Sequence, residues 1–352
     1  MTPCPAAFAI PGDIATLTGG YLYERRLLDG LRLIGHDMLH LELPASFPDP
    51  SAQDMAVALA ALASVPADRP VILDGLVFGA IDPAGLAQIR APLVAMVHHP
   101  LATETALTPG QRDHLFATER ANLRLVRHVL VPSPHTRAIL IDRYDVAPDR
   151  ITIARPGVER PRLAPSPVSP PLILSVGILH PRKGHDILVE ALGGVADLDW
   201  RAVIVGRTWD RAHAAALERQ IAASPVAPRI RLAGQVTDDA LERLYAQATV
   251  FALATRFEGH GLVFDEALVR GLPIVSCRTG AVPDTVPPQA GLLVPPADAP
   301  AFGGALGRVL TDATLRRRLA QGASRAGKDL PGWDHTAAVA SRVLAEVRAA
   351  AT

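Results

Sequence analysis

Residues 175–192 read SVGILHPRKGHDILVEAL. An apolar run ends in Gly177, a short loop carries Arg182 and Lys183, and a stretch with helical periodicity follows. This order is typical of a buried parallel strand, a turn and a crossover helix. A helix start offers unpaired N–H groups and a partial positive charge, so Lys183 beside it indicates an anion site suited to phosphate. A solvated Arg-Lys pair in a loop is the plainer alternative.

The same alternation of short apolar runs and helical stretches continues along the chain. In the first half, strands are expected at 7–10, 37–42, 71–74, 93–97, 128–131 and 152–154. In the second half, they are expected at 172–177, 202–205, 230–232, 250–252, 274–276 and 292–294. Helices are expected at 21–35, 55–65, 186–192, 212–221, 241–246, 262–271 and 336–350. The sequence therefore predicts an α/β protein with two successive sheet-and-helix domains.

A proline-rich segment marks the boundary between these domains. Residues 156–171 read PGVERPRLAPSPVSPP, and repeated proline forbids helix and favours an extended, semi-rigid connector. We expect an N-terminal domain over 1–160, a linker over 161–171 and a C-terminal domain over 172–333. Residues 334–352 form a final helical segment in this interpretation.

Composition excludes several classes of protein. Among the 352 residues, Lys plus Arg and Asp plus Glu both number 35, so the net charge gives no support for a nucleic-acid partner. Cys4 and Cys277 provide neither a disulfide framework nor metal-ligand spacing, and Cys277 is expected to be buried and inert. The uncharged stretch 163–181 contains five prolines, so it is no membrane-spanning helix. Because the first residues also lack a secretory signal, we expect a cytoplasmic protein, and the Ala, Leu, Gly and Pro bias is typical of a bacterial source.

A second polar segment lies at residues 256–275, which read RFEGHGLVFDEALVRGLPIV. Glu258 precedes a glycine-flanked turn, and Glu266 lies inside the helix that begins near Leu262. The glycines let the backbone approach a ligand closely, and the helix start offers more unpaired N–H groups. Two carboxylates can orient ribose and sugar hydroxyls without covalent chemistry, since they accept hydrogen bonds from hydroxyl groups. Either glutamate alone is more often a solvated helix charge.

In the first half, the stretch PLVAMVHHPLATET places His98 and His99 at the carboxyl end of an expected strand. Ligands of open α/β sheets bind at this edge. Adjacent residues of an extended chain point to opposite sides, so at most one of the two histidines is expected to face the ligand, and the other is expected to be structural. Metal binding is the weaker interpretation, because none of the remaining histidines completes a zinc-ligand set.

The stretch IPGDIATLTGGYLYERR, residues 10–26, leads from the first strand into a helix through Gly19 and Gly20. Its backbone can sit against phosphate, although a Gly-Gly turn alone is commonly structural. The segment contains neither a G-x-G-x-x-G fingerprint nor a Walker loop, which argues against a nicotinamide or ATP enzyme.

Taken together, these motifs resemble those of the family-4 glycosyltransferases of the GT-B architecture. The resemblance runs in order over most of the chain, through TGGYLYERR, VHHPL, VPSPHTR, PRKGHDILVEAL, FEGHGLVFDEALVRGLPIV, the turn that contains Gly280, and AGLLVPP. It implies two Rossmann-like domains that face a central cleft, with a last helix that crosses back to the first domain. It also implies a nucleotide diphosphate sugar as donor substrate and no cofactor.

The resemblance assigns roles to individual residues. It implies that Lys183, aided by Arg182, meets the diphosphate, that Glu266 accepts ribose hydroxyls and that Glu258 holds the donor sugar. His98, Lys183 and Glu258 form the implied catalytic set, with His98 near the sugar hydroxyls. The implied donor-binding residues are Gly19, Gly20, Arg182, Lys183, Val236, Glu258, Gly261, Leu262, Val263 and Glu266, with Val236 near the base.

For the reaction, the resemblance implies transfer with retention of anomeric configuration and no obligatory metal. The acceptor is an unidentified glycan, lipid or small molecule. Two residues depart from the family pattern: Ile178 stands where an arginine is usual, which removes one phosphate cation, and His260 stands where an aromatic residue is usual. A GT-B sugar-nucleotide epimerase and a non-catalytic sugar-nucleotide-binding module remain as alternatives.

Overall fold

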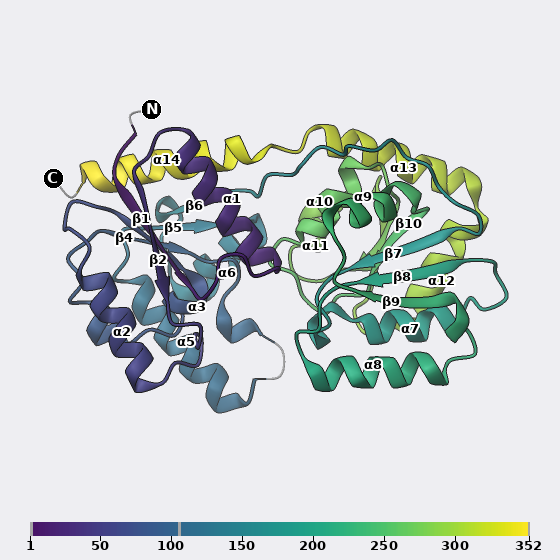
Figure 1. Cartoon of the computed structure of the whole chain (residues 1–352), viewed down its shortest axis with the longest axis horizontal. Coiled ribbons are helices and arrows are strands. Elements are labelled where there is room, and N and C mark those ends of the chain that lie inside the picture. Colours follow the sequence, from purple (N-terminus) through teal and green to yellow (C-terminus); the bar gives the residue numbers. More distant parts are fainter. Residues whose placement is uncertain (1–2, 105–106, 351–352) are drawn as a thin grey trace. The chain divides into compact units, whose positions relative to one another are not determined.

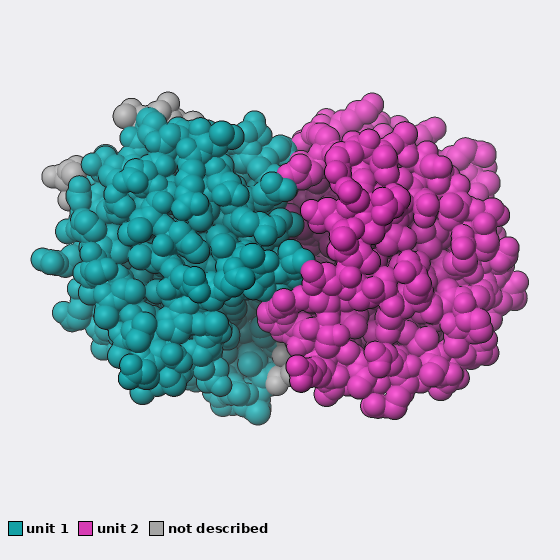
Figure 2. Space-filling view, in the orientation of Figure 1, with its two compact units in different colours: residues 1–157, 331–352 teal, residues 158–330 magenta. Residues whose placement is uncertain are grey.

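A computed structural model describes residues 3–104 and 107–350 and divides the chain into two compact units. Unit 1 combines Met1–Gly157 with Pro331–Thr352, and unit 2 is Val158–Leu330 (Figure 2). Each unit contains a six-stranded parallel sheet with helices packed against it (Figure 1). The twelve strands of the described residues match the twelve predicted ones within two residues at each end, so the α/β prediction is confirmed.

The sheet of unit 1 has the strand order β2-β1-β3-β4-β5-β6. Its strands are β1 (Ala6–Pro11), β2 (Met38–Leu43), β3 (Val71–Asp74), β4 (Leu93–Met96), β5 (His128–Val131) and β6 (Ile151–Ile153). Its α-helices are α1 (Gly19–Leu33), α2 (Ala52–Ala63), α3 (Gly75–Phe78), α4 (Pro83–Leu86), α5 (Pro109–Leu123), α6 (Pro134–Tyr144) and α14 (Trp333–Ala349). Two short 3₁₀ turns, η1 (Leu101–Thr103) and η2 (Pro148–Arg150), complete the unit.

Alternate residues of β1 belong to two separate cores, one on each face of the sheet. Ala7 and Ala9 pack into the core beneath α2 and α5, whereas Phe8 and Ile10 pack into the core that α1 and α14 cover. This period of two explains why the buried strands are apolar throughout. Both cores are needed to cover the sheet, so the C-terminal helix is an integral part of unit 1.

Helix α14 packs directly against α1 (Figure 1). A Cβ atom on Gly30 of α1 would lie only 2.8 Å from Ala337 Cβ, so glycine permits this close approach. Leu27, Leu28 and Leu31 of α1 are buried as their spacing predicts. Spacing alone would place Ile34 on the same buried face, but α1 ends at Leu33 and the Ile34 side chain is exposed.

The sheet of unit 2 has the order β12-β11-β10-β7-β8-β9. Its strands are β7 (Leu172–Val176), β8 (Arg201–Val205), β9 (Ile230–Gly234), β10 (Val250–Leu253), β11 (Ile274–Cys277) and β12 (Gly291–Val294). Its α-helices are α7 (His185–Gly193), α8 (Arg211–Ala223), α9 (Asp238–Gln247), α10 (Leu262–Val269), α11 (Val282–Thr285), α12 (Ala299–Thr311) and α13 (Ala313–Lys328). The 3₁₀ turns are η3 (Pro181–Lys183) and η4 (Ala227–Arg229).

The proline-rich segment was predicted to be a linker between domains, but in the structure residues 161–171 lie within unit 2. The unit boundary lies at Gly157/Val158. Their backbone is anchored on α9, where the Ser166 N–H donates to Ala246 O at 2.7 Å. Proline removes internal helix bonds but leaves the remaining N–H groups able to bond to a neighbouring element.

Two expectations drawn from the composition concern Cys277 and membrane-spanning helices. Cys277 is buried, as expected, and burial raises the pKa of its thiol to about 11, which disfavours the reactive thiolate. Among the helices of residues 3–104 and 107–350, none combines the length and apolar character needed to cross a bilayer.

Candidate functional site

The centre of the candidate site in unit 2 is the ion pair between Lys183 and Glu258. Lys183 ends the η3 turn after β7, and Glu258 lies in the loop after β10, the strand beside β7. The carboxyl ends of neighbouring parallel strands meet at one edge, so the sheet brings these two loops together. Lys183 Nζ lies 2.6 Å from Glu258 Oε1, and Thr255 Oγ1 donates to the same oxygen at 3.1 Å.

Glycines allow the loops to approach this closely. Gly184 has φ +64°, and a Cβ atom there would lie 1.9 Å from Ala254 O. Gly280 has φ +52°, and a Cβ atom there would lie 2.3 Å from Glu258 O. Both conformations favour glycine, and both sites lack room for any side chain. The two glycines therefore set the position of the Glu258 loop.

The charged groups at the site are one carboxylate and two cations. Burial raises the pKa of Glu258, but Lys183 and Arg182 outweigh burial and hold that pKa below its ordinary value. Arg182 Nη1 lies 3.9 Å from Glu258 Oε2. Arg182 therefore supplies a second cation beside Lys183, although the half-buried Ile178 supplies none.

Glu266 lies on α10, and Tyr245 of α9 holds its carboxyl group. The Tyr245 hydroxyl donates to Glu266 Oε2 at 2.7 Å. Burial raises the pKa of Glu266, although Tyr245 and Arg270 counteract part of this effect. The acid is therefore oriented by a bond from its own unit.

The turn before α10 and its first residues are the segment whose backbone was predicted to contact the donor. Gly261 has φ +86° and begins α10 without a side-chain cap, and Leu262 and Val263 follow it half-buried. His260 is buried and bonds through Nε2 to Asp265 Oδ2 at 2.6 Å. Asp265 thus provides the partner that a histidine requires in this buried position.

Val236 lies between β9 and α9, two elements that carry neither Lys183 nor Glu258. Its half-buried side chain packs on the core of unit 2 and lines a hollow of about 210 Å³. The other lining residues are Arg231, Ala240, Arg243, Leu244 and Gln247. The proximity of Val236 to a base stays a prediction.

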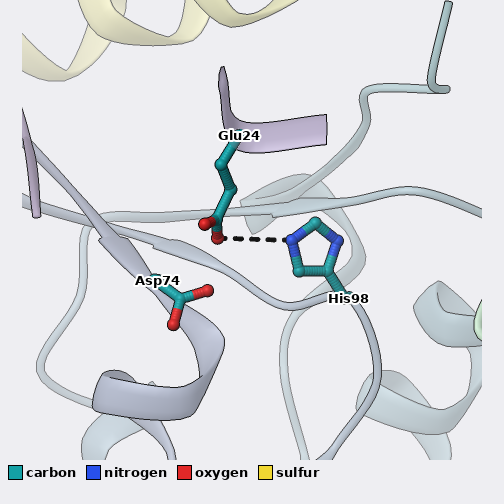
Figure 3. A group of neighbouring side chains, drawn as sticks. All are labelled: Glu24, Asp74 and His98. Atoms are coloured by element: carbon teal, nitrogen blue, oxygen red, sulfur yellow. Dashed lines mark hydrogen bonds and ion pairs between the residues drawn. The ribbon is translucent and has the colours of Figure 1, made fainter. Parts of the chain in front are cut away.

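In unit 1, His98 lies in a polar cluster with Glu24 of α1 and Asp74 at the end of β3 (Figure 3). His98 Nε2 lies 3.4 Å from Glu24 Oε1, and both acids are buried. A Cβ atom on Gly20 would lie 3.6 Å from His98 Cδ2, so the Gly19-Gly20 helix start faces this ring. His99 instead bonds to Glu104 at 2.6 Å, as expected for adjacent residues that point to opposite sides.

The two acids of this cluster interact through a hydrogen bond that shifts their titration. Burial raises the pKa of Asp74 well above its ordinary value, and the nearby Glu24 raises it further. Burial also raises the pKa of Glu24 to about 7, while the hydrogen bond from Asp74 acts in the opposite direction. Burial therefore favours the protonated form of both acids. Burial lowers the pKa of His98, so its ring is neutral at pH 7.

Glu24, Asp74 and His98 are also the residues that could hold a metal ion. One ligand atom from each lies within 4.8 Å of the others. A cation would have to compete with protons for these acids, because a metal ligand is a deprotonated carboxylate and burial raises the pKa of both.

Glu24, Asp74 and Tyr245 are not among the functional residues predicted from the sequence. Asp74 directly follows the buried run VIL, which is the signal that marks the carboxyl end of a parallel strand. Glu24 and Tyr245 lie in helical stretches, where nothing in their spacing predicts a partner in another segment.

Two family models match the chain over most of its length. The model described as glycosyl transferases group 1 matches residues 170–312, and the model described as glycosyltransferase family 4 matches residues 39–162. The chain belongs to the family-4 glycosyltransferases. One curated relative of this family-4 member is D-inositol 3-phosphate glycosyltransferase from Salinispora tropica, with 30% identity over 279 residues. The match covers 70% of this chain and 57% of the relative, so the chain spans little more than half of that protein.

Solved structures show that this family-4 member has the GT-B fold. Sucrose-phosphate synthase from Thermosynechococcus elongatus has a TM-score of 0.85 at 21% identity, covering 98% of this chain and 99% of that one. The Anabaena protein HepE, solved in complex with UDP-glucose, has a TM-score of 0.74 at 16% identity, covering 98% and 99% of the two chains. The fold resemblance stated from the sequence is confirmed.

Proposed function

We propose that this family-4 member transfers a sugar from a nucleotide diphosphate sugar to an acceptor hydroxyl, with retention of configuration and without a metal ion. The observation that carries the proposal is the contact of Lys183 with Glu258 at the carboxyl edge of the second sheet. An ammonium, a guanidinium and a carboxylate meet there, and a sugar joined to a diphosphate offers groups that match all three. The complex of HepE with UDP-glucose supports a donor of this class.

In the proposed reaction, the bond between the anomeric carbon and the diphosphate oxygen breaks, and the acceptor oxygen bonds to that carbon. The leaving diphosphate keeps the electron pair and takes the proton of the acceptor hydroxyl. Lys183 and Arg182 stabilise the charge that develops on the diphosphate. One such charge pair at about 4 Å and an effective dielectric near 20 contributes about 4 kcal/mol.

The remaining groups position the donor. Glu258 is proposed to accept hydrogen bonds from sugar hydroxyls, and Glu266 to accept them from ribose hydroxyls. His98 is proposed as the side chain that unit 1 contributes to sugar transfer. A glycan, a lipid or a small molecule is the proposed class of acceptor.

A thermal-shift screen of UDP, GDP and ADP sugars tests the donor class, because a ligand that binds only the folded state raises its stability. We expect one base to stabilise the protein more than the others. If no nucleotide sugar shifts the unfolding transition, the donor proposal is wrong.

Incubation of the enzyme with the best donor alone separates transfer from epimerisation. A transferase leaves the sugar configuration of the donor unchanged, whereas an epimerase releases an isomerised donor. Donor binding without turnover across a broad acceptor panel would favour a non-catalytic binding module. For a transferase, the anomeric configuration of the product and the effect of a chelator test retention and metal independence.

A further inference from the structure

Glu266 uses one of its two carboxylate oxygens in contacts with its own unit. Oε2 accepts the 2.7 Å bond from the Tyr245 hydroxyl. No hydrogen bond within residues 3–104 and 107–350 uses Oε1. Tyr245 therefore orients the carboxyl group and leaves Oε1 able to accept from a ligand hydroxyl.

Tyr245 is itself held rigidly. It is 1% exposed, and its ring stacks on Phe251 with 6.2 Å between centroids and 16° between planes. The Arg270 guanidinium lies 4.4 Å from the centroid of the same ring. A buried hydroxyl without a partner is costly, so the bond to Glu266 is also the bond that the Tyr245 hydroxyl requires.

Arg270 connects this pair to a second acidic residue, Glu242. Its Nη1 donates to Glu266 O at 2.9 Å, and its Nη2 forms an ion pair with Glu242 of α9. Both side chains of the ion pair are largely buried. Burial raises the pKa of Glu242, but the bonds from Arg270 and from two backbone N–H groups hold that pKa below its ordinary value.

Those two N–H groups belong to the proline-rich segment that follows the unit boundary. Glu242 Oε1 accepts from Arg162 N at 2.7 Å and from Leu163 N at 3.1 Å. The same helix, α9, therefore carries the residue that orients Glu266 and the residue that anchors positions 162 and 163. In Figure 1, α9 lies beside α10, as the bond between Tyr245 and Glu266 requires.

We propose that Tyr245, Arg270 and Glu242 are positioning residues that hold Glu266 for the ribose of the donor and tie it to the docked backbone of residues 162–163. This inference rests on the proposed function, because it takes a nucleotide as the ligand. Nucleotide affinity then depends on the docking of this segment. By linkage, the nucleotide stabilises the docked segment by the same factor.

The first test compares Tyr245→Phe with Tyr144→Phe, which removes a buried hydroxyl in unit 1. The probes are inorganic pyrophosphate and the nucleoside diphosphate, among UDP, GDP and ADP, that stabilises the wild type most. We expect Tyr245→Phe to weaken nucleoside diphosphate binding by about tenfold, a typical coupling between sites, with pyrophosphate binding unchanged. A merely structural defect would weaken both ligands together, and that result would overturn the proposal, as would wild-type affinity for both. Tyr144→Phe should bind both ligands as the wild type does.

The second test is hydrogen exchange of the full chain with and without the same nucleoside diphosphate. We expect the nucleotide to slow exchange at the amides of residues 162 and 163 in the wild type. Glu242→Gln should exchange faster at these amides and lose the nucleotide effect, while Glu218→Gln, at an exposed glutamate of α8, should behave as the wild type. If the nucleotide leaves the exchange rates of these amides unchanged in the wild type, the coupling is contradicted. A nucleotide effect of wild-type size in Glu242→Gln contradicts it as well.

The two proposals fail in distinguishable ways. A wild-type protein that binds none of the three nucleoside diphosphates contradicts the proposed function and the inference together. A wild type that binds one of them, with a Tyr245→Phe variant of equal affinity, contradicts the inference alone.

Discussion

Lys183 donates to Glu258 across 2.6 Å, so the residue proposed to bind the diphosphate is already paired with the residue proposed to bind the sugar. A diphosphate that approaches Lys183 must share its ammonium with this carboxylate or displace it. Under the proposed function, this competition for Lys183 would influence both the affinity for the nucleotide and the charge available during transfer.

Replacement of Lys183 by alanine removes the principal cation from the leaving group. We expect turnover to fall by about 30- to 1000-fold, equivalent to about 2 to 4 kcal/mol of transition-state stabilisation. Steady-state kinetics with the best donor measure the effect. The other lysine of the sequence, Lys328, is exposed on α13, and Lys328→Ala is the matched control. Unchanged turnover in a correctly folded Lys183→Ala protein removes Lys183 from the phosphate site.

Replacement of Glu258 by glutamine should separate nucleotide binding from turnover. The variant no longer pairs with Lys183 and no longer repels the diphosphate, so we expect free nucleoside diphosphate to bind about three- to tenfold more tightly. Turnover should fall, because the amide accepts hydrogen bonds from sugar hydroxyls less strongly than the carboxylate does. Calorimetry and kinetics on the same preparation give both values. Weaker nucleotide binding by this variant would contradict the competition for Lys183.

Titration of Glu24 should appear in the pH dependence of kcat/KM. Its pKa is raised by burial to about 7, and the ionised form accepts from His98 Nε2, which leaves His98 Nδ1 as an acceptor. For a single group with this pKa, the ionised fraction rises about tenfold between about pH 6 and pH 8. We expect kcat/KM to rise with it in the wild type and to lack this inflection in Glu24→Gln. Glu42→Gln, at an exposed position of β2, should keep the inflection.

Glu119 should make the stability of the protein fall with rising pH. It is fully buried on α5, and burial raises the pKa of its carboxyl group to about 8. Between its ordinary pKa and this value, the folded state binds more protons than the unfolded state, so the free energy of unfolding decreases as pH rises, by at most about 1.4 kcal/mol per pH unit. Denaturant unfolding of Glu119→Gln across this window should show a shallower decrease. Equal slopes in the two proteins would mean that Glu119 ionises normally.

Gly184→Ala should disturb the site through the backbone. The added Cβ would meet Ala254 O at 1.9 Å, and the positive φ of Gly184 disfavours alanine. We expect a loss of about 1 to 3 kcal/mol in the free energy of unfolding. Gly110→Ala is the matched control, since nothing lies within 4 Å of its added Cβ and the site is helical. A Gly184→Ala protein as stable as the wild type would mean that the η3 turn can move away from the β10 loop.

The strands, their parallel class and the segments that meet at the sheet edge could all be predicted from the amino-acid sequence. Buried parallel strands are apolar on both faces, and this pattern is local enough to identify in runs such as LILSV and VILD. Lys183 and His98 were identified because each follows such a run and therefore lies near the carboxyl edge of a sheet. Glu258 was identified instead from the glycine-flanked turn that follows it.

The partners of these residues could not be predicted from the sequence and are known from the tertiary structure. Glu24 is separated from Asp74 by 50 positions along the chain, and Tyr245 belongs to a different helix from Glu266, so no spacing along the sequence predicts either contact. The same holds for the proline-rich segment, whose composition excludes helix but does not specify the surface on which it docks. Side-chain pairing across elements depends on packing in three dimensions, whereas periodicity reports only which face of one element is buried.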